Sequence, residues 1–157
     1  MKIEEKELEK RMNHFEKICH DSGFKLTHQR MEIFQEVAKA GDHPDAETVY
    51  QRIRKKLPTI SLDTVYRTLW FLKELGMITI LGSDHHRTRF DANLNHHHHF
   101  VCVDCGITLD FYSEELDKLN LPESIDSIGI AESSQVEVRG LCHTCASKRG
   151  NSKRKTA

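Results

Sequence analysis

Four cysteines in two Cys-x2-Cys pairs constrain this 157-residue chain more than any other feature. The pairs are Cys102 with Cys105 and Cys142 with Cys145. Two such pairs can place four thiolates at about 2.3 Å from one ion, which completes the tetrahedral shell of a structural zinc site. Protein sulfur then fills every position, and none is left for water or substrate. We therefore expect Zn2+ to stabilise the C-terminal half without taking part in catalysis.

Disulfide bonds are the alternative use of these cysteines. The first residues do not have the pattern of a secretory signal peptide, and a fifth cysteine, Cys19, has no partner at a similar spacing. Both observations favour a reducing cytosol, where disulfides are rare. No stretch approaches the roughly 18 apolar residues that a membrane span requires. We therefore expect a cytoplasmic protein with no membrane partner.

A run of four histidines, residues 96–99, lies directly before the first cysteine pair, and an all-cysteine site would leave it unused. In an extended segment alternate side chains share a face, so His97 and His99 point one way and the other two point the opposite way. Asp91 and Asp110 flank the run. Two imidazoles and two carboxylates suit Fe2+, Mn2+ or Zn2+. The sequence therefore predicts a second metal site, and a solvated polar loop is the alternative.

Apolar residues at helical spacing predict four helices in the first half of the chain. Gly23, Gly41, Pro58 and Gly76 mark their ends. Thr27 and Asp45 are expected N-caps of the second and third helices, and Ser61 precedes the fourth, over residues 62–75. Residues 77–81 and 88–91 have the composition of two strands of a hairpin. Helices followed by such a hairpin indicate a winged helix-turn-helix.

In a winged helix-turn-helix the fourth helix enters the major groove of DNA, so its early polar residues face the bases. The expected DNA contacts are Lys25, Arg30, Thr64, Tyr66, Arg67 and Thr68. Residues 1–90 hold 16 Lys or Arg against 14 Asp or Glu, a small excess from which we expect tight binding to require a dimer. A helical bundle with a solvated polar face is the alternative.

A zinc enzyme is the competing functional class. Nucleoside deaminases use His-x-Glu followed by Pro-Cys-x2-Cys. His14-Phe15-Glu16 matches the first part, but Val101 and Leu141 precede the two cysteine pairs. The second pair would also be surplus. We therefore expect neither an enzyme nor a small-molecule substrate.

Several segments together resemble the Fur (ferric uptake regulator) superfamily of bacterial metal-dependent repressors, over roughly residues 20–147. They are Leu26 to Arg30, His43-Pro44, Ser61 to Leu69, Arg89-Phe90-Asp91, His97 to Gly106, and the last cysteine pair. The resemblance implies an α+β protein with a winged-helix domain over residues 1–82, a hinge over 83–91, and an α/β dimerisation and metal-binding domain over 92–148. The basic residues 149–157 are expected to form a disordered tail.

Within the superfamily the chain is most similar to the peroxide-sensing PerR branch. The resemblance places a regulatory metal site at His43, Asp91, His97, His99 and Asp110, and each position holds the expected type of ligand. Aspartate at position 91 is typical of peroxide sensors, whereas iron sensors usually have glutamate there. The resemblance implies a homodimer that represses by binding double-stranded operator DNA when Fe2+ or Mn2+ is bound. It also implies that peroxide oxidises His97 or His99 when the metal is Fe2+.

An iron-responsive (Fur-type) or zinc-responsive (Zur-type) repressor without peroxide sensing remains the alternative, because the ligand sets overlap. An additional Fur-type site would use His96, His98 and a histidine eight residues before Cys142. Ser134 stands at that last position. The additional site is therefore incomplete in this sequence.

Overall fold

A computed structural model describes residues 3–81 and 88–154, without the side chains of residues 150–154. The chain divides into two compact units, Met1–Asn95 and His96–Ala157. The sequence placed a hinge at residues 83–91, but β2 occupies the end of that range and belongs to the first unit; residues 82–87 lie outside the described part. In the described residues, no helix is both long enough and apolar enough to span a membrane.

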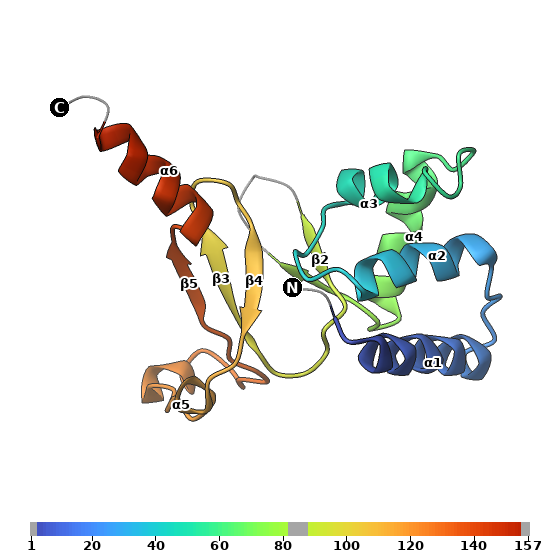
Figure 1. Ribbon diagram of the computed structural model, residues 1–157. Coiled ribbons are helices and arrows are strands. Elements are labelled where there is room, and N and C mark those ends of the chain that lie inside the picture. The colour runs from blue at the N-terminus through green and yellow to red at the C-terminus, as the bar shows by residue number, and fades with distance from the viewer. Residues whose placement is uncertain (1–2, 82–87, 155–157) are drawn as a thin grey trace. The chain divides into compact units, whose positions relative to one another are not determined.

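The N-terminal unit has the element order of a winged helix (Figure 1). Its helices are α1 (Glu5–Asp21), α2 (His28–Ala38), α3 (Ala46–Ile53) and α4 (Leu62–Glu74), and its strands are β1 (Thr79–Leu81) and β2 (Arg89–Asp91). The two strands pair antiparallel, with Ile80 opposite Phe90. The predicted four helices and hairpin are thus confirmed.

Side-chain caps begin three of these helices at the expected residues. Thr27, Asp45 and Ser61 each accept a hydrogen bond from the backbone N–H three residues later, at 3.3, 2.7 and 3.1 Å. Each bond satisfies one of the amides that the first turn of a helix leaves without an intrahelical partner. The short polar residues at these positions therefore set where α2, α3 and α4 start.

The helices bury a common apolar core. Phe15 of α1 and Phe34 of α2 lie with ring centroids 4.6 Å apart, and Val65, Leu69 and Leu72 form the buried stripe of α4. Phe90 of β2 belongs to the same core, so the wing is packed against the helices. Full burial of one such side chain stabilises the fold by about 1.5–3 kcal/mol. Cys19 is also buried there.

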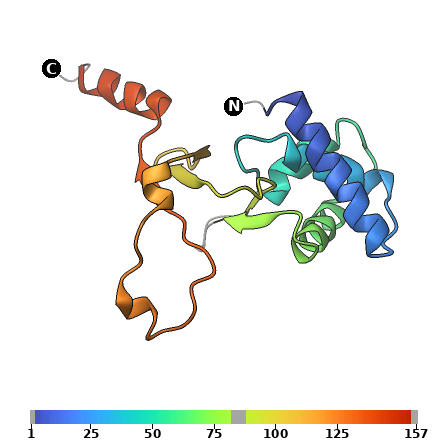
Figure 2. The same cartoon turned by 90° about the horizontal axis from the view of Figure 1, so that it is seen from below.

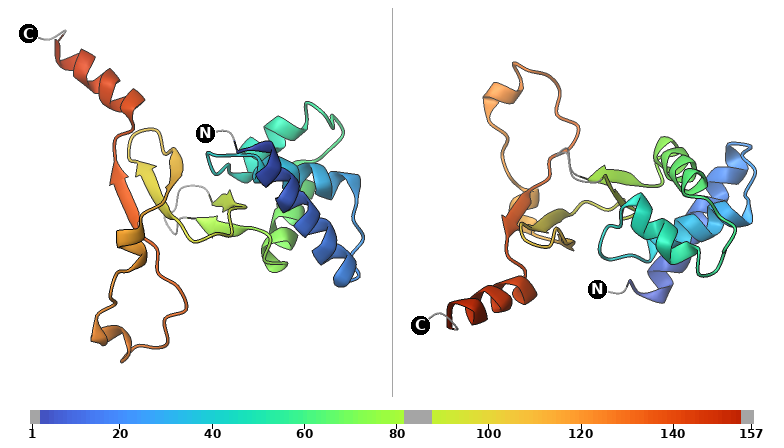
Figure 3. Two further views of the ribbon diagram at one scale, coloured as in Figure 1. Left: turned by 60° about the horizontal axis from the view of Figure 1, so that its bottom comes forward. Right: turned by 90° about the horizontal axis from the view of Figure 1, so that it is seen from above.

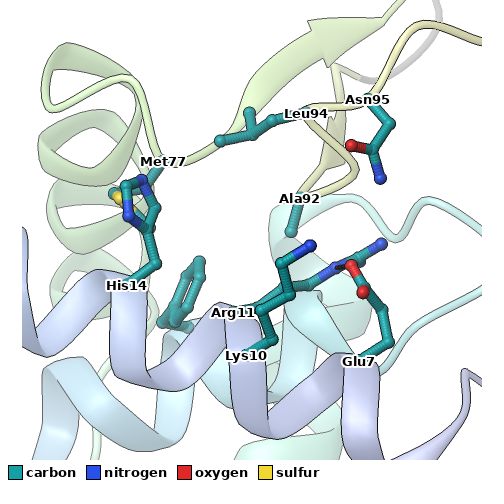
Figure 4. Close-up of a pocket in the computed structure, with 9 residues that line it drawn as sticks. Glu7, Lys10, Arg11, His14, Met77, Ala92, Leu94 and Asn95 are labelled. Carbon is teal, nitrogen blue, oxygen red and sulfur yellow. Dashed lines mark hydrogen bonds and ion pairs between the residues drawn. The ribbon is translucent and has the colours of Figure 1, made fainter.

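A hollow of about 250 Å³ lies beside α1. Figure 4 shows Glu7, Lys10, Arg11 and His14 of α1 on one side of it and Ala92, Leu94 and Asn95 on the other. Arg11 is engaged here, because its Nε bonds to Glu7 at 3.1 Å and its Nη1 donates to the carbonyl of Ala38 at 3.1 Å. These two hydrogen bonds fix the Arg11 side chain of α1 against the C-terminal end of α2.

The C-terminal unit is built on a three-stranded sheet in the order β4-β3-β5. The strands are β3 (His98–Cys102), β4 (Thr108–Phe111) and β5 (Glu137–Gly140); β4 pairs antiparallel with β3, and β5 pairs parallel with it. Gly140 lies opposite Cys102, where a Cβ atom would come within 3.2 Å of the Phe100 ring. The missing side chain therefore lets β5 approach the central strand.

Most of the residues between β4 and β5 form a wide excursion, plainly visible in Figure 2. It contains only the short helix α5 (Glu114–Asp117) and a single 3-10 turn, Glu123–Ile125. After β5, helix α6 (His143–Arg154) leads away from the end of the strand (Figure 3). Disorder was expected from residue 149 onward. Helix α6 instead starts at the second cysteine pair and continues through the basic residues to Arg154.

Candidate metal centres and DNA-facing helix

The four paired cysteines come together in the C-terminal unit. Cys102 ends β3, Cys105 lies in the turn that follows, and Cys142 and Cys145 flank the start of α6. Their sulfur atoms all lie within 4.8 Å of one another, and Cys105 Sγ is 3.8 Å from Cys142 Sγ. A tetrahedron with metal–sulfur bonds of about 2.3 Å requires sulfur atoms about 3.8 Å apart. The donor set therefore fits one zinc ion.

Backbone geometry prepares this cluster for a cation. The backbone N–H groups of Cys105 and Cys142 hydrogen-bond to Cys102 and lower the pKa of its thiol to about 6. Cys142, in contrast, raises the pKa of the Cys145 thiol above its usual value. One thiolate thus forms readily at pH 7, whereas four adjacent thiolates are stable only when a cation offsets their repulsion.

The second donor cluster lies at the start of β3 and on its neighbour β4. His97 Nε2 and His99 Nε2 are 2.8 Å apart, and they lie 3.4 and 3.6 Å from Asp110 Oδ1. Asp110 is the cross-strand partner of His99. The alternation predicted for the histidine run is therefore confirmed. Two imidazoles and one carboxylate aimed at one point form a donor set suited to Fe2+, Mn2+ or Zn2+.

The remaining two predicted ligands meet inside the N-terminal unit. His43 Nε2 lies 3.6 Å from Asp91 Oδ1, and both side chains are buried. Asp91 is oriented by its own turn, because Oδ1 accepts the backbone N–H of Asn93 at 2.7 Å. Next to His43 in the sequence, Asp42 accepts hydrogen bonds from Arg52, which lower the pKa of the Asp42 carboxyl. The N-terminal unit thus supplies one imidazole and one carboxylate, preoriented side by side.

A third cluster forms on the opposite face of the histidine run. His96 Nε2 and His98 Nε2 lie 3.0 and 3.1 Å from Asp117 Oδ1. These three residues offer metal-ligand atoms, but His98 Nδ1 accepts the backbone N–H of Val136 at 3.2 Å. A metal-bound imidazole normally donates a hydrogen bond through its other nitrogen. Here Nδ1 accepts a hydrogen bond instead, which leaves the ring proton on Nε2, and Nε2 lies 3.1 Å from Asp117 Oδ1 without a hydrogen-bond partner among the described residues. The cluster is therefore a poorer metal site than the other two.

Helix α4 exposes one polar face. Arg67 is 81% exposed in its side chain and pairs with Asp63 one turn earlier at 2.9 Å. Tyr66 is also exposed, and the Thr64 hydroxyl lies 2.8 Å from the Ser61 hydroxyl. An exposed pair between neighbouring turns contributes little stability, so Arg67 can exchange its partner at small cost.

Thr68 departs from the predicted DNA-facing set. It is only 7% exposed and lies beside Leu69 on the buried side of α4. It follows Val65 by three residues, which places both on one face of the helix. Trp70, which the sequence reasoning did not select, is exposed one turn after Tyr66 and lies under Lys73 at 5.9 Å. The exposed aromatic pair Tyr66 and Trp70 therefore replaces Thr68 on this face.

Two of the predicted DNA contacts, Lys25 and Arg30, precede α4, and they differ in how free their side chains are to bind DNA. Lys25 is exposed, whereas Arg30 lies 4.0 Å over the Phe71 ring and donates from Nη1 to the Lys25 carbonyl at 2.7 Å. Arg30 therefore supports the loop before α2 as well as presenting charge.

Comparison with known proteins identifies the family. The ferric uptake regulator family matches residues 21–132. The chain belongs to this family. Fur-family members are metal-responsive transcription regulators, and the winged helix, small sheet and four-cysteine cluster described above agree with that membership.

Two curated relatives illustrate the range of similar Fur-family proteins. The peroxide-responsive repressor PerR of Staphylococcus epidermidis is 30% identical over 125 residues, which cover 79% of this chain and 83% of the relative. The ferric uptake regulation protein of Synechococcus elongatus is 34% identical over 131 residues, which cover 80% and 88%. Relatives with different signals are thus similarly distant from this chain.

A solved structure supports the fold. The ferric uptake regulator of Helicobacter pylori, which has three functional metal-binding sites, superimposes with a TM-score of 0.71 at 24% identity. The match covers 93% of this chain and 97% of that one. At this identity the likeness establishes the shared Fur-family fold.

Proposed function

We propose that this Fur-family regulator is a metal-dependent repressor that senses hydrogen peroxide. The observation that carries the proposal is the pair of donor groups, His43 with Asp91 and His97 with His99 and Asp110. Aspartate at position 91 favours the peroxide-sensing branch of the family, and a PerR protein is among the similar relatives. We further propose a cytoplasmic location, where reduced thiols and operator DNA are both present.

All five donors are proposed to bind one ion, as the family resemblance implies. His43 and Asp91 belong to the N-terminal unit, and the other three donors belong to the C-terminal unit. When both groups bind the same ion, the two units are held in one relative orientation. In a dimer this fixes the separation of the two α4 helices, which must match successive half-sites about 34–36 Å apart. DNA binding then depends on metal, because the ion binds the DNA-binding arrangement of the units more tightly than other arrangements.

The peroxide response is assigned to the histidine ligands. Fe2+ held by these residues would supply the redox chemistry by which peroxide adds one of its oxygen atoms to a ligand ring and releases the other as water. His97 and His99 are the proposed targets, because their Nε2 atoms lie 2.8 Å apart beside Asp110 and would both bind the same ion. An oxidised ring is a weaker ligand, so its unit is no longer held and the operator is released.

Loading with different metals tests this proposal. Protein with Fe2+ should gain one oxygen atom on His97 or His99 after stoichiometric peroxide and lose operator binding. Protein with Mn2+ should keep both, since Mn2+ is much less reactive toward peroxide. Peptide mass spectrometry and operator titration measure the two results. Oxidation confined to cysteine would instead assign the response to a thiol.

An iron-responsive or zinc-responsive repressor is the second candidate. The relative from Synechococcus elongatus, a ferric uptake regulation protein, favours it at 34% identity. The donor set of His97, His99 and Asp110 also suits zinc. Operator titrations with Fe2+, Mn2+ and Zn2+ in the absence of oxygen, repeated after peroxide, separate the candidates. Unchanged binding of the iron-loaded protein after peroxide would favour this second candidate.

The structural metal is proposed to be Zn2+, held by Cys102, Cys105, Cys142 and Cys145. The sulfur spacing and the lowered pKa of the Cys102 thiol support this assignment. The site has no open position, so the zinc acts on stability alone.

The partner of the C-terminal unit is proposed to be a second copy of the chain. Large apolar side chains are exposed on this unit, and Ile130 is 96% exposed. The others are Val103, Tyr112, Leu119, Leu121, Ile128 and Val138. Exposed apolar groups on a small unit favour association that removes them from water.

Replacing Arg67 with alanine tests the DNA-facing role of α4. We expect operator affinity to fall by about 1–3 kcal/mol, the usual value of one specific base contact. Thermal stability should change little, because the residue is exposed and its pair with Asp63 is weak. Lys118→Ala is the matched control, since Lys118 is an exposed cation of the C-terminal unit. Equal operator affinity of the two variants at matched salt would remove Arg67 from the specificity contacts.

A further inference from the structure

His43 has an unusual backbone conformation. It is the residue other than glycine that has a positive φ in the described chain, at 47°. Residues with a Cβ atom rarely adopt this left-handed region, and they keep it only where surrounding contacts hold them there. The contacts that hold His43 therefore control where its imidazole points.

Arg89 fastens the backbone of this turn. Its Nη1 donates to the carbonyl oxygens of Asp42 and His43 at 3.3 and 3.0 Å. The next residue, Phe90, donates its backbone N–H to the Pro44 carbonyl at 3.1 Å. Strand β2 thus holds the carbonyl side of the turn, and the same strand carries Asp91.

Arg52 fastens the other side of the turn from α3. Its Nη2 donates to Asp42 Oδ2 at 2.6 Å and its Nη1 donates to Asp42 Oδ1 at 3.3 Å, which makes a two-pronged pair. Nη1 also lies 3.9 Å from Glu36 of α2, whose side chain is buried. A planar guanidinium fixes the orientation of a carboxylate as well as its distance. Asp42 is therefore oriented by two helices, directly before the strained residue.

We propose that Arg52 is a positioning residue for the regulatory metal: through Asp42 it keeps His43 in the left-handed conformation that directs its imidazole toward Asp91. The inference rests on the proposed regulatory site. It adds that a residue of α3, Arg52, orients the metal ligand His43. Metal binding and the Arg52–Asp42 pair support each other, because coupling between two sites is reciprocal. The ligand His43 is thus connected to the helix that packs against α4.

Electrostatics and positioning predict opposite results for one substitution. Arg52→Gln removes a positive charge near a cation site, so charge alone would tighten binding of a divalent ion. Loss of positioning would weaken it. Asp42→Asn removes a negative charge and weakens binding in either case. The sign of the Arg52→Gln effect therefore separates the two explanations.

The experiment is a titration of zinc-replete full-length protein with Mn2+. We expect Arg52→Gln and Asp42→Asn each to weaken Mn2+ binding about 10-fold, the effect of losing a residue that orients a metal ligand. The double variant should be no weaker than either single variant, because both remove the same pair. Arg54→Gln is the matched control. It makes the same charge change two residues later, at the end of α3, where Arg54 lies over the Tyr50 ring. Its affinity should equal that of the wild type.

Several outcomes would overturn the inference. They are unchanged or tighter Mn2+ binding in Arg52→Gln, effects that multiply in the double variant, and an equal loss in Arg54→Gln. Chemical denaturation without Mn2+ verifies that each variant is folded during the titration. His43→Ala separates this inference from the proposed function. If His43→Ala binds Mn2+ like the wild type, the regulatory site itself is misassigned; if it weakens binding while Arg52→Gln does not, only the positioning role fails.

Discussion

Replacing Cys102 with serine should remove the bound zinc and unfold the C-terminal unit. Zinc contributes about 10–16 kcal/mol in small metal-dependent domains, as much as the whole stability of an ordinary domain, about 5–15 kcal/mol. The sheet of this unit has three short strands and exposes much of its apolar surface, so little else stabilises it. Serine keeps the size of the side chain but provides no thiolate. Cys142→Ser should have the same effect.

Metal analysis and circular dichroism measure this result. The N-terminal unit should stay folded, because its own core of four helices contains no zinc ligand among the described residues. Cys19→Ala is the control: it removes a buried thiol of α1 and should keep one zinc per chain. A Cys102→Ser protein that is zinc-free, dimeric and fully folded would contradict the structural assignment of the cluster.

Asp91→Glu should preserve metal-dependent DNA binding while slowing the reaction with peroxide. Glutamate keeps the charge but adds a methylene, so the carboxylate moves or binds through both oxygens. The turn that now orients Asp91 through the Asn93 N–H would no longer fit. We expect histidine oxidation to slow by about 10- to 100-fold, the range found when reacting groups are displaced by about 1 Å. Operator affinity with Fe2+ or Mn2+ should change far less.

The paired measurements are operator affinity with each metal and the rate of oxidation at His97 and His99. Asp104→Glu is the control, because Asp104 pairs with Arg149 and lies outside the regulatory ligands. Equal oxidation rates in wild type and Asp91→Glu would mean that this carboxylate does not set peroxide reactivity. A wild type that itself resists peroxide would move the assignment to an iron or zinc sensor.

Local chemistry made the N-terminal helices predictable. Thr27, Asp45 and Ser61 stand directly before apolar residues at helical spacing, and each caps a helix in the structure. The histidine run was predictable for a similar reason, since alternation along a strand depends only on the backbone. His97 and His99 therefore share one face with Asp110, as expected.

Thr68 was misplaced because its hydroxyl was given more weight than its position beside the buried stripe of α4. Its short side chain lies beside Leu69 in the core, whereas the larger Trp70 is left exposed. Helical periodicity places Thr68 on the side of the buried stripe, three residues after Val65, and Trp70 on the exposed side, one turn after Tyr66. The packing of α4 against α3 and α2 buries the first of these faces.

The sequence by itself determined the elements, the family and the ligand types, because caps, periodicity and cysteine spacing act over a few residues. Only the tertiary structure brought Asp117 to His96 and His98, placed Val136 against His98 Nδ1, and set Arg52 on Asp42. These contacts join residues that are 10 to 38 positions apart along the chain. Such contacts form only after the elements pack, when burial and hydrogen-bond geometry select one partner among many that the sequence allows. Those late contacts decide which histidines are oriented to bind metal.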